Sequence, residues 1–410
     1  MGRLRLPGIA QLVTLALALA WLLLIDFYAL RIAGQRLATH PRALDFTVFW
    51  AAARAPLGAI YDAAELTRLQ ATGLGGLMPF AYPPTFLAVV APLRLLPFWP
   101  AYLAWVGLGS LAYFAAAARL YSRQSLVLVT ISPAFVMTAV AGQSSLLVAA
   151  LVLGGFSLLR PRPAVAGALF AAAALIKPQT VVLLPLVLLA AREWRALGAC
   201  LAVGVIAGLA SVLALGAAPW AAWIGSLGGF LDVVRDGGSL AHGATPETLA
   251  MQLSLSAGPA LALCAVLGAA GIAIALAAGL KRLEPRLMAP AVVACGLLVS
   301  PYGLRYDLAP LLPLAASLLT DRRLTLWVGL GVIALSYYFL NPITVIGVAS
   351  YIAVALAEPR QLSLPGAAPR TISARRGARV AGVETLDSQA AGGVPLAEAP
   401  STPCRGELAD

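Results

Sequence analysis

The chain has 410 residues, of which 61% are hydrophobic and only 11% are charged. Because soluble domains carry roughly a quarter charged residues, this composition favours a polytopic membrane protein over a soluble one. The net charge of +11 does not indicate a nucleic-acid partner, since the basic residues occur in ones and twos between apolar runs and form no basic stripe. We therefore expect the basic residues to report membrane topology.

The first long apolar run, residues 7–32, follows Arg3 and Arg5 and is long enough for one membrane crossing. It exceeds the apolar core of a signal peptide, and no small-residue cleavage site follows it, so we expect an uncleaved first helix. With the later apolar runs it predicts an all-α polytopic membrane protein with about twelve transmembrane helices. The candidate spans are residues 8–31, 98–119, 125–141, 144–159, 163–176, 179–191, 197–216, 259–280, 288–301, 307–320, 324–340 and 343–357.

Basic residues in short turns mark the cytoplasmic side of a membrane protein. If Arg3 and Arg5 lie inside, every short basic turn falls on the same side, and both termini are cytoplasmic. These turns are residues 119–123, 160–162, 192–195, 281–286 and 322–323. The outer, periplasmic face of the cytoplasmic (inner) membrane then carries two long loops, 32–97 and 217–258.

Both outer loops contain apolar stretches that are not expected to cross the membrane. Residues 85–96 are bounded by prolines and are too short for a span, so they predict a re-entrant or interfacial helix. Residues 219–234 predict the same, since their two tryptophans suit an interface. We divide the chain into a membrane domain, 1–357, and a polar cytoplasmic tail, 358–410, which we expect to be disordered.

Polar residues gather on the predicted outer side, which is where a membrane-surface active site would require them. Ionisable groups next to hydrocarbon are costly and tend to face cavities or partners. The residues concerned are Asp45, Asp62, Gln143, Lys177, Gln179, His242, Tyr302, Arg305, Tyr306 and Asp307.

Asp45 precedes Phe46, Phe49 and Trp50 at the start of an apolar segment. A carboxylate held against aromatic rings is a plausible general base, because partial desolvation raises its pKa toward working pH. An aspartate that opens an apolar segment is also typical of a helix N-cap. The spacing alone leaves both interpretations open.

Lys177 interrupts an apolar run and could hold a phosphate as a point charge, or it could be an interfacial lysine that ends a helix. Arg305 could complete a phosphate-binding mouth, or it could pair with Asp307. Gln143 lies in a Gly-Gln-Ser-Ser sequence that reads as a tight turn or as a hydrogen-bonding group for a sugar. Tyr302, with its neighbours, could stack on a sugar. His242 is a lone histidine and a weak signal.

Several motifs with well-defined chemistry are missing from the sequence. There is no Asp-x-Asp, no His-Glu-x-x-His, no Gly-x-Ser-x-Gly and no phosphate-binding glycine loop of the nucleotide-hydrolase type. The four cysteines form no Cys-x-x-Cys pair, so they predict neither a disulfide framework nor a zinc site. We expect no cofactor, although Asp45 and Asp62 leave a divalent metal open.

The polar motifs recur in a recognisable order: Asp45-Phe46-x-x-Phe49-Trp50, Ile60-Tyr61-Asp62, Phe80-x-Tyr82-Pro83-Pro84, Gly142-Gln143-Ser144, Lys177-Pro178-Gln179 and Ser300-Pro301-Tyr302. In this order the chain resembles glycosyltransferase family 87, which includes polyprenol-phosphate-mannose-dependent mannosyltransferases. The resemblance covers about residues 40 to 310. It implies a membrane fold of the GT-C type, a lipid-phosphate sugar donor, a lipid or glycan acceptor and inverting transfer of a hexose on the non-cytoplasmic face.

By this resemblance, Asp45 matches the catalytic aspartate of the family and would deprotonate the acceptor hydroxyl. We expect Lys177 and Arg305 to hold the phosphate of the donor. The side chains expected to bind substrate are Tyr82, Gln143, Gln179, Tyr302, Tyr306 and Asp307.

One position departs from the family pattern. Actinobacterial members usually show two histidines after the late Ser-Pro, where this chain has Tyr306 and Asp307. A histidine role is therefore not carried over, and the assignment of mannose as the sugar loses that support. Two alternatives remain, a transporter of a lipid-linked sugar and a polymerase or ligase of surface polysaccharide, although transporters place their charges near the bilayer midplane.

Overall fold

The structure is a computed structural model, and it is described here over residues 9–40, 44–71, 78–236, 243–320, 325–336 and 341–357. Within these ranges the chain is helical, and the only extended pairing is an isolated antiparallel bridge between Gly243 and Leu304. The expectation of an all-α protein is thus confirmed for this part of the chain. His242, the predicted tail, Arg3, Arg5 and the basic turn 322–323 lie outside the described residues.

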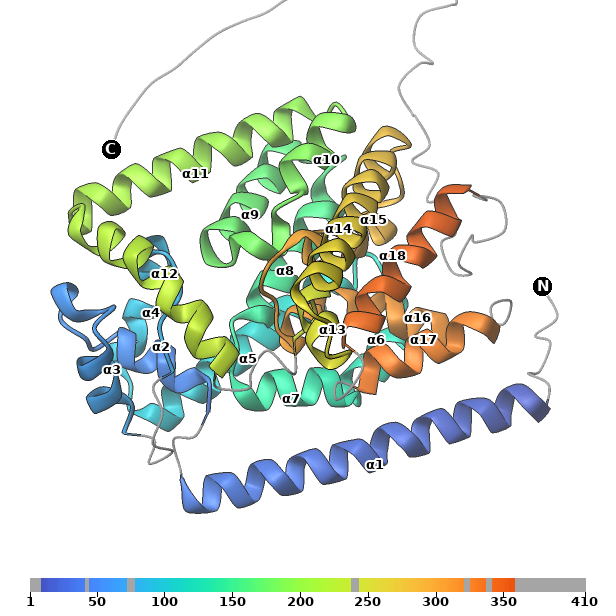
Figure 1. Cartoon of the computed structure of the whole chain (residues 1–410), viewed down its shortest axis with the longest axis horizontal. Helices are drawn as coiled ribbons and strands as arrows, with labels where there is room; N and C mark the ends of the chain where they lie inside the picture. The colour runs from blue at the N-terminus through green and yellow to red at the C-terminus, as the bar shows by residue number, and fades with distance from the viewer. Residues whose placement is uncertain are drawn as a thin grey trace, which may run out of the picture. The chain divides into compact units, whose positions relative to one another are not determined.

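The N-terminal quarter of the chain holds one long helix followed by short helices. The long helix α1 packs along α7 and α17, whereas the short elements form the first predicted outer loop (Figure 1). These elements are α1 (Ile9–Thr39), α2 (Phe46–Ala52), η1 (Leu57–Ala59), α3 (Ala63–Gln70), η2 (Pro84–Phe86), α4 (Leu87–Val90) and η3 (Ala91–Leu95).

The middle of the chain builds the core and a long surface helix. Helix α8 packs against α5 and α9, and α9 packs against α11. Helix α12 turns back from α11 toward η1 and η2 (Figure 1). These elements are α5 (Phe98–Ala117), α6 (Arg123–Thr130), α7 (Pro133–Ala141), α8 (Ser145–Leu158), α9 (Pro163–Ile176), η4 (Pro178–Val181), α10 (Leu184–Ala190), α11 (Trp194–Leu215) and α12 (Ala218–Asp236).

The C-terminal part of the described chain packs onto the same core. Helix α15 contacts α14, α18 and α8, and η6 lies against α8. These elements are α13 (Pro246–Gln252), α14 (Ala257–Leu280), α15 (Pro285–Val299), η6 (Arg305–Leu311), α16 (Leu312–Thr320), α17 (Thr325–Ser336) and α18 (Asn341–Ala357).

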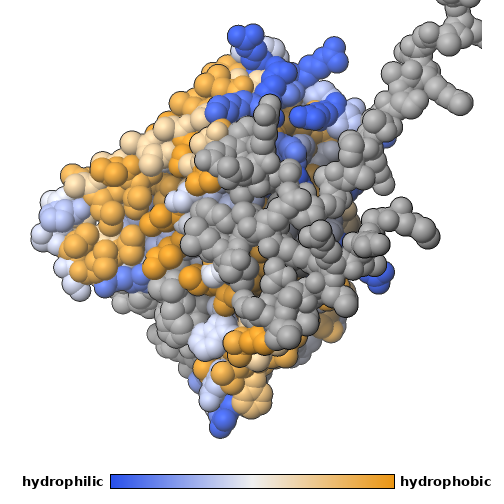
Figure 2. Space-filling view, turned by 90° about the vertical axis from the view of Figure 1, so that its right-hand side faces the viewer, coloured by the Kyte–Doolittle hydropathy of each residue, from blue (hydrophilic) through white to orange (hydrophobic). Residues whose placement is uncertain are grey.

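Among the described residues, four helices are long and apolar enough to cross a membrane: Ala16–Thr39 within α1, α5, α11 and α14. Their apolar side chains point outward, as Leu213 does with 87% of its surface exposed. Figure 2 shows a broad area of hydrophobic side chains on one face, with hydrophilic side chains gathered at its upper edge. Such a surface suits a lipid environment. The chain is therefore an all-α membrane protein, and the count of twelve spans stays a prediction.

The predicted span 125–141 is not one straight helix. Helices α6 and α7 meet at a bend of 58°, so at most they form one broken span. Ser132 caps α7 by accepting a hydrogen bond from the Phe135 N–H, and Pro133 follows at the first helical position. Because proline cannot continue a preceding helix and serine favours an N-cap, the sequence itself restarts the helix here.

The apolar helices α8 and α15 are short and buried rather than lipid-facing. Most of their side chains are buried, and both are surrounded by other helices. A helix that is hydrophobic on all sides belongs in the interior of a protein or a membrane bundle. This position brings the start of α8 and the end of α15 into the interior, where the polar residues of the candidate site collect.

Candidate active site

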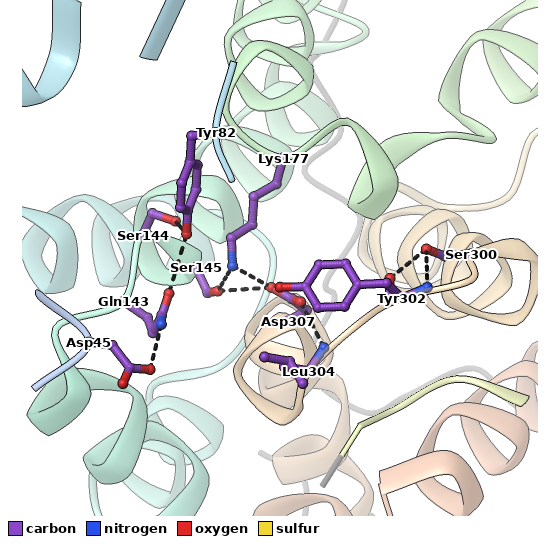
Figure 3. A network of polar contacts seen from close by, with 10 residues as sticks. All are labelled: Asp45, Tyr82, Gln143, Ser144, Ser145, Lys177, Ser300, Tyr302, Leu304 and Asp307. Carbon is purple, nitrogen blue, oxygen red and sulfur yellow. Dashed lines mark hydrogen bonds and ion pairs between the residues drawn. The ribbon is translucent and has the colours of Figure 1, made fainter. Parts of the chain in front are cut away.

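Polar side chains from five separate parts of the chain, including Tyr82 before η2, converge on one buried network (Figure 3). Asp45 comes from the residue before α2, and Gln143 to Ser145 come from the turn between α7 and α8. Lys177 follows α9, and Asp307 lies in the first turn of η6. The network therefore joins residues that the sequence predicts for the site across gaps of up to 130 positions.

The turn between α7 and α8 is fixed against the start of α2. Gly142 ends α7 with φ +68°, a left-handed conformation that glycine adopts without strain. A Cβ at this position would lie 2.7 Å from the Cβ of Phe46. The indole of Trp105 also donates to the carbonyl of Gly142 at 3.0 Å. Glycine is thus required for the close approach that places Gln143 beside Asp45.

Asp45 occupies the N-cap position of α2, yet its carboxylate makes no capping hydrogen bond there. Its Oδ2 instead accepts a hydrogen bond of 2.6 Å from the amide Nε2 of Gln143. The Oε1 of that amide accepts from the hydroxyl of Tyr82 at 3.4 Å. The carboxylate therefore faces the network, which favours the functional interpretation of Asp45 over the capping one.

Tyr82 is held by an aromatic cluster from the first predicted outer loop. Its ring lies 4.8 Å from Phe86, 5.2 Å from Phe49 and 5.4 Å from Phe80. Its hydroxyl also shares a hydrogen bond of 3.0 Å with Ser144. Burial raises the pKa of Tyr82 above its ordinary value, although the nearby Lys177 charge opposes this. Tyr82 is therefore a neutral donor across the physiological pH range.

Lys177 is paired with Asp307 inside the protein. Its Nζ lies 2.7 Å from Asp307 Oδ1 and 2.8 Å from Ser145 Oγ. The Ser145 hydroxyl donates to the same Asp307 oxygen at 3.0 Å, and the other oxygen accepts from the Leu304 N–H. Burial lowers the pKa of Lys177, but Asp307 and Tyr82 more than offset this, so the pKa is raised and the ammonium stays charged.

Two further tyrosines border this ion pair. The ring of Tyr306 lies 4.5 Å from Lys177 Nζ, within the range of a cation–π contact. Tyr302 packs edge-on against Phe230 of α12 at 5.0 Å. Burial raises the pKa of both phenols well above the ordinary value. The structure thus brings Tyr302 and Tyr306 next to Lys177 and Asp307, as a single site requires.

The other predicted residues lie at the edge of this network or away from it. Gln179 is partly buried in η4, two positions beyond Lys177, and Arg305 is partly buried at the start of η6. Asp62 caps α3, since its carboxylate accepts from the Glu65 N–H at 2.8 Å. His242 is not among the described residues. The described part of the chain contains no group of three His, Cys, Asp or Glu side chains that could hold a metal ion.

Two residues that form hydrogen bonds in or beside the network were not predicted from the sequence. Ser145 bridges Lys177 and Asp307, although a serine after Gly-Gln-Ser reads as an ordinary turn residue. Trp223 of α12 donates to the carbonyl of Ala81 at 3.2 Å, next to Tyr82. The sequence predicts an interfacial position for this tryptophan, because it lies in an apolar stretch, and that pattern does not indicate a contact with the site.

Two apolar cavities border the network. One, of about 530 Å³, lies between η3, α5, α7 and α8 and includes Gly142 and Gln143 in its wall. The other, of about 710 Å³, lies between α2, α4, α9 and α11 and reaches Thr85 and Ile176, which precedes Lys177. Cavities of this size and lining are typical of sites for apolar ligands. The first cavity therefore meets the network at Gln143, whereas the second reaches only the residue before Lys177.

The middle of the chain matches a known protein family. Residues 80–301, more than half of the chain, match the family model described as Glycosyltransferase family 87. The chain belongs to glycosyltransferase family 87. It is accordingly a glycosyltransferase, an enzyme that uses a sugar donor and an acceptor. No curated protein and no solved structure matches the chain.

The boundaries of the match separate the site residues of this glycosyltransferase into two groups. Tyr82, Gln143 and Lys177 lie within the matched residues, whereas Asp45 precedes them and Asp307 follows them. The two outlying carboxylates are joined to the matched region by Gln143 and Lys177 respectively. The roles of the carboxylates therefore rest on the geometry of this structure.

Proposed function

We propose that this glycosyltransferase moves a hexose from a polyprenyl-phosphate sugar to a lipid or glycan acceptor, with Asp45 as the general base. The observation that carries the proposal is the hydrogen-bonded Asp45 carboxylate beside a buried polar network and an apolar cavity. A soluble nucleotide sugar is polar and has no hydrocarbon chain that an apolar cavity next to the sugar could bind. A lipid-linked sugar needs both kinds of surface.

The proposed reaction is a direct displacement at the anomeric carbon. Asp45 takes the proton of the acceptor hydroxyl while the oxygen of that hydroxyl forms a bond to the anomeric carbon. The bond between the carbon and the phosphate oxygen breaks on the opposite side, and polyprenyl phosphate leaves with the electron pair. Attack opposite to the leaving group inverts the configuration of the sugar. The single carboxylate base needed for this step is Asp45.

Cationic groups stabilise a departing phosphate, and Arg305 is the first candidate for that role. It begins η6, two positions before Asp307, and a guanidinium can bind two phosphate oxygens at once. Lys177 already donates two of its three N–H groups to Asp307 and Ser145, so at most one is left for a phosphate oxygen. Its charge contributes to the site as part of the pair with Asp307.

The remaining predicted residues surround the sugar in this proposal. Tyr82, Tyr302 and Tyr306 offer aromatic faces and hydroxyls, which suit stacking on a sugar ring and hydrogen bonding to it. Gln179 borders the same region. The short basic turns of the sequence support a site on the outer face of the cytoplasmic membrane, opposite to the cytoplasmic termini.

The proposal is tested by offering the purified protein in lipid nanodiscs a panel of donors. The panel holds synthetic polyprenyl-phosphate hexoses that differ in configuration at C2 and C4, and the corresponding nucleotide sugars, with and without chelator. Transfer from one lipid donor only, with inversion of the anomeric linkage, supports the proposal. Transfer from a nucleotide sugar would contradict it. Movement of the intact donor across a sealed bilayer without transfer would instead indicate a transporter.

A further inference from the structure

Gln143 contacts two functional side chains through the two different atoms of its amide (Figure 3). Its Nε2 donates to Asp45, and its Oε1 accepts from Tyr82. A carboxylate can only accept and a phenol can donate, so this orientation satisfies both neighbours. The reverse orientation would place two acceptor oxygens against each other. The hydrogen bond from Tyr82 therefore determines that Asp45 meets the nitrogen of the amide and not its oxygen.

The position of Gln143 is fixed before any substrate binds. Its side chain is only 8% exposed. The preceding turn is fastened to α5, because Trp105 donates to the Gly142 carbonyl and Tyr102 donates to the Val140 carbonyl at 2.9 Å. The amide thus belongs to a rigid support that stands behind the carboxylate of Asp45.

The titratable side chains near Asp45 come from several other elements of the fold. Among the described residues they include Tyr82, Lys177, Tyr302, Tyr306 and Asp307. The three phenols stay neutral because burial raises their pKa values, and the charge of Asp45 raises them further. The ammonium of Lys177 is compensated by Asp307. One donor to the Asp45 carboxylate is a neutral amide, that of Gln143.

We infer that Gln143 is the positioning residue of Asp45, which it orients and keeps ionised through the hydrogen bond to Oδ2, instead of binding the sugar. This inference rests on the proposed role of Asp45 as the base. A neutral donor orients a carboxylate without lowering its basicity as strongly as a cation would. The arrangement suits a base that must hold a proton during the reaction.

The inference predicts a change in pH dependence when the amide is lost. A hydrogen bond to the charged form of a carboxyl group lowers its pKa, so its removal raises the pKa. In Gln143→Ala, the acidic limb of kcat/KM should move to higher pH by about one unit, and kcat should fall about tenfold or more, with little change in donor KM. In Gln143→Glu, a second carboxylate next to Asp45 should move the limb further.

Two other variants complete the design. Tyr82→Phe removes the hydroxyl that orients the amide and should move the limb in the same direction by a smaller amount. Gln70→Ala is the matched control, because Gln70 is also a buried glutamine but lies in the first outer loop and hydrogen-bonds the backbone of Met78. This control should leave the acidic limb in place. Retained folding of each variant is checked by its thermal unfolding curve.

A spectroscopic readout keeps the inference testable without turnover. The protonated carboxyl of Asp45 gives an infrared band that is identified by its loss in Asp45→Asn. The pH at which this band appears should be higher in Gln143→Ala and Gln143→Glu than in the wild type. If the wild type transfers no sugar but the band shifts, the proposed function fails while the contact between Gln143 and Asp45 stands.

Two results would overturn the inference. In the first, Gln143→Ala raises donor KM and leaves both the acidic limb and the infrared titration unchanged, which would make Gln143 a substrate-binding residue. In the second, Gln143→Ala and Gln70→Ala lose the same activity at every pH, which would make its role structural. The inference is supported if the acidic limb of kcat/KM and the infrared band of Asp45 shift in the Gln143 variants but not in Gln70→Ala.

Discussion

Lys177 and Asp307 form an ion pair of 2.7 Å in which both side chains are buried, with 3% and 1% of their surfaces exposed. The pair joins the end of α9 to η6, which lies 130 positions further along the chain. Ser145 at the start of α8 connects to both partners. One ion pair thus holds together three of the elements that surround the candidate site.

Replacing one partner of this ion pair should destabilise the fold through the unpaired charge that it leaves buried, whereas replacing both partners leaves no such charge. In Lys177→Met, the carboxylate of Asp307 stays buried without its cation, and the expected loss is about 3–5 kcal/mol in the free energy of unfolding. Asp307→Asn should cost a similar amount. The double variant Lys177→Met/Asp307→Asn leaves no unpaired charge, so it should be more stable than the sum of the single losses predicts. Unfolding followed in detergent at fixed protein concentration measures this, and additive losses would contradict the coupling.

The pair also shows what the sequence could and could not predict. Asp45, Gln143, Lys177 and Asp307 could be assigned to one site because their motifs occur in a family order and on one side of the predicted topology. That Lys177 binds Asp307 could not be predicted, since Arg305 stands two positions away and matches the same carboxylate chemically. The sequence positions of Lys177 and Arg305 do not show which of the two binds Asp307 in the fold.

The helices show the same division. The long helices α5, α11 and α14 follow from apolar runs of spanning length, and the apolar stretch 219–234 with its two tryptophans predicts α12. The number of membrane spans could not be settled in this way. Helices α8 and α15 are as apolar as the lipid-facing ones but are buried in protein. Composition does not distinguish burial in protein from exposure to lipid.

Gly142 should tolerate no side chain. Gly142→Ala forces alanine into a left-handed conformation and places its Cβ against Phe46, so we expect a loss of about 2 kcal/mol or more in the free energy of unfolding. Because Phe46 follows Asp45, activity should fall as well. Gly107→Ala in α5 is the control, since a Cβ there meets nothing within 4 Å. Equal melting temperatures for the two variants would contradict the close approach.

Arg305 should affect the binding of phosphate more than the chemical step. Arg305→Gln removes a charged hydrogen-bond donor, worth about 1.5–3 kcal/mol, and should raise donor KM about ten- to a hundredfold. Inhibition by free polyprenyl phosphate should weaken in parallel. Arg68→Gln serves as the control, because Arg68 is an exposed arginine of the first outer loop whose ion pair with Glu65 lies at the surface. A change in kcat alone for Arg305→Gln would argue against phosphate binding.

The tyrosines of the site should make stability depend on alkaline pH. Burial raises the pKa of Tyr306 well above 10.0, so the folded protein keeps its phenol neutral while the unfolded chain ionises near 10.0. The contribution to stability is therefore full below about pH 10 and falls above it, by up to about 1.4 kcal/mol per pH unit for one tyrosine. Tyr306→Phe should reduce the slope of unfolding free energy between about pH 10 and 11. An unchanged slope would mean that Tyr306 ionises freely in the folded protein.

The most direct test of the account is a comparison of wild type and Asp45→Asn in nanodiscs, with sugar transfer and donor binding measured on the same preparations. Asparagine keeps the shape of the side chain but cannot accept the proton of the acceptor hydroxyl. We predict that transfer from the polyprenyl-phosphate sugar falls by at least about a hundredfold while the donor Kd changes little. Undiminished transfer by Asp45→Asn would contradict the assignment of Asp45 as the base.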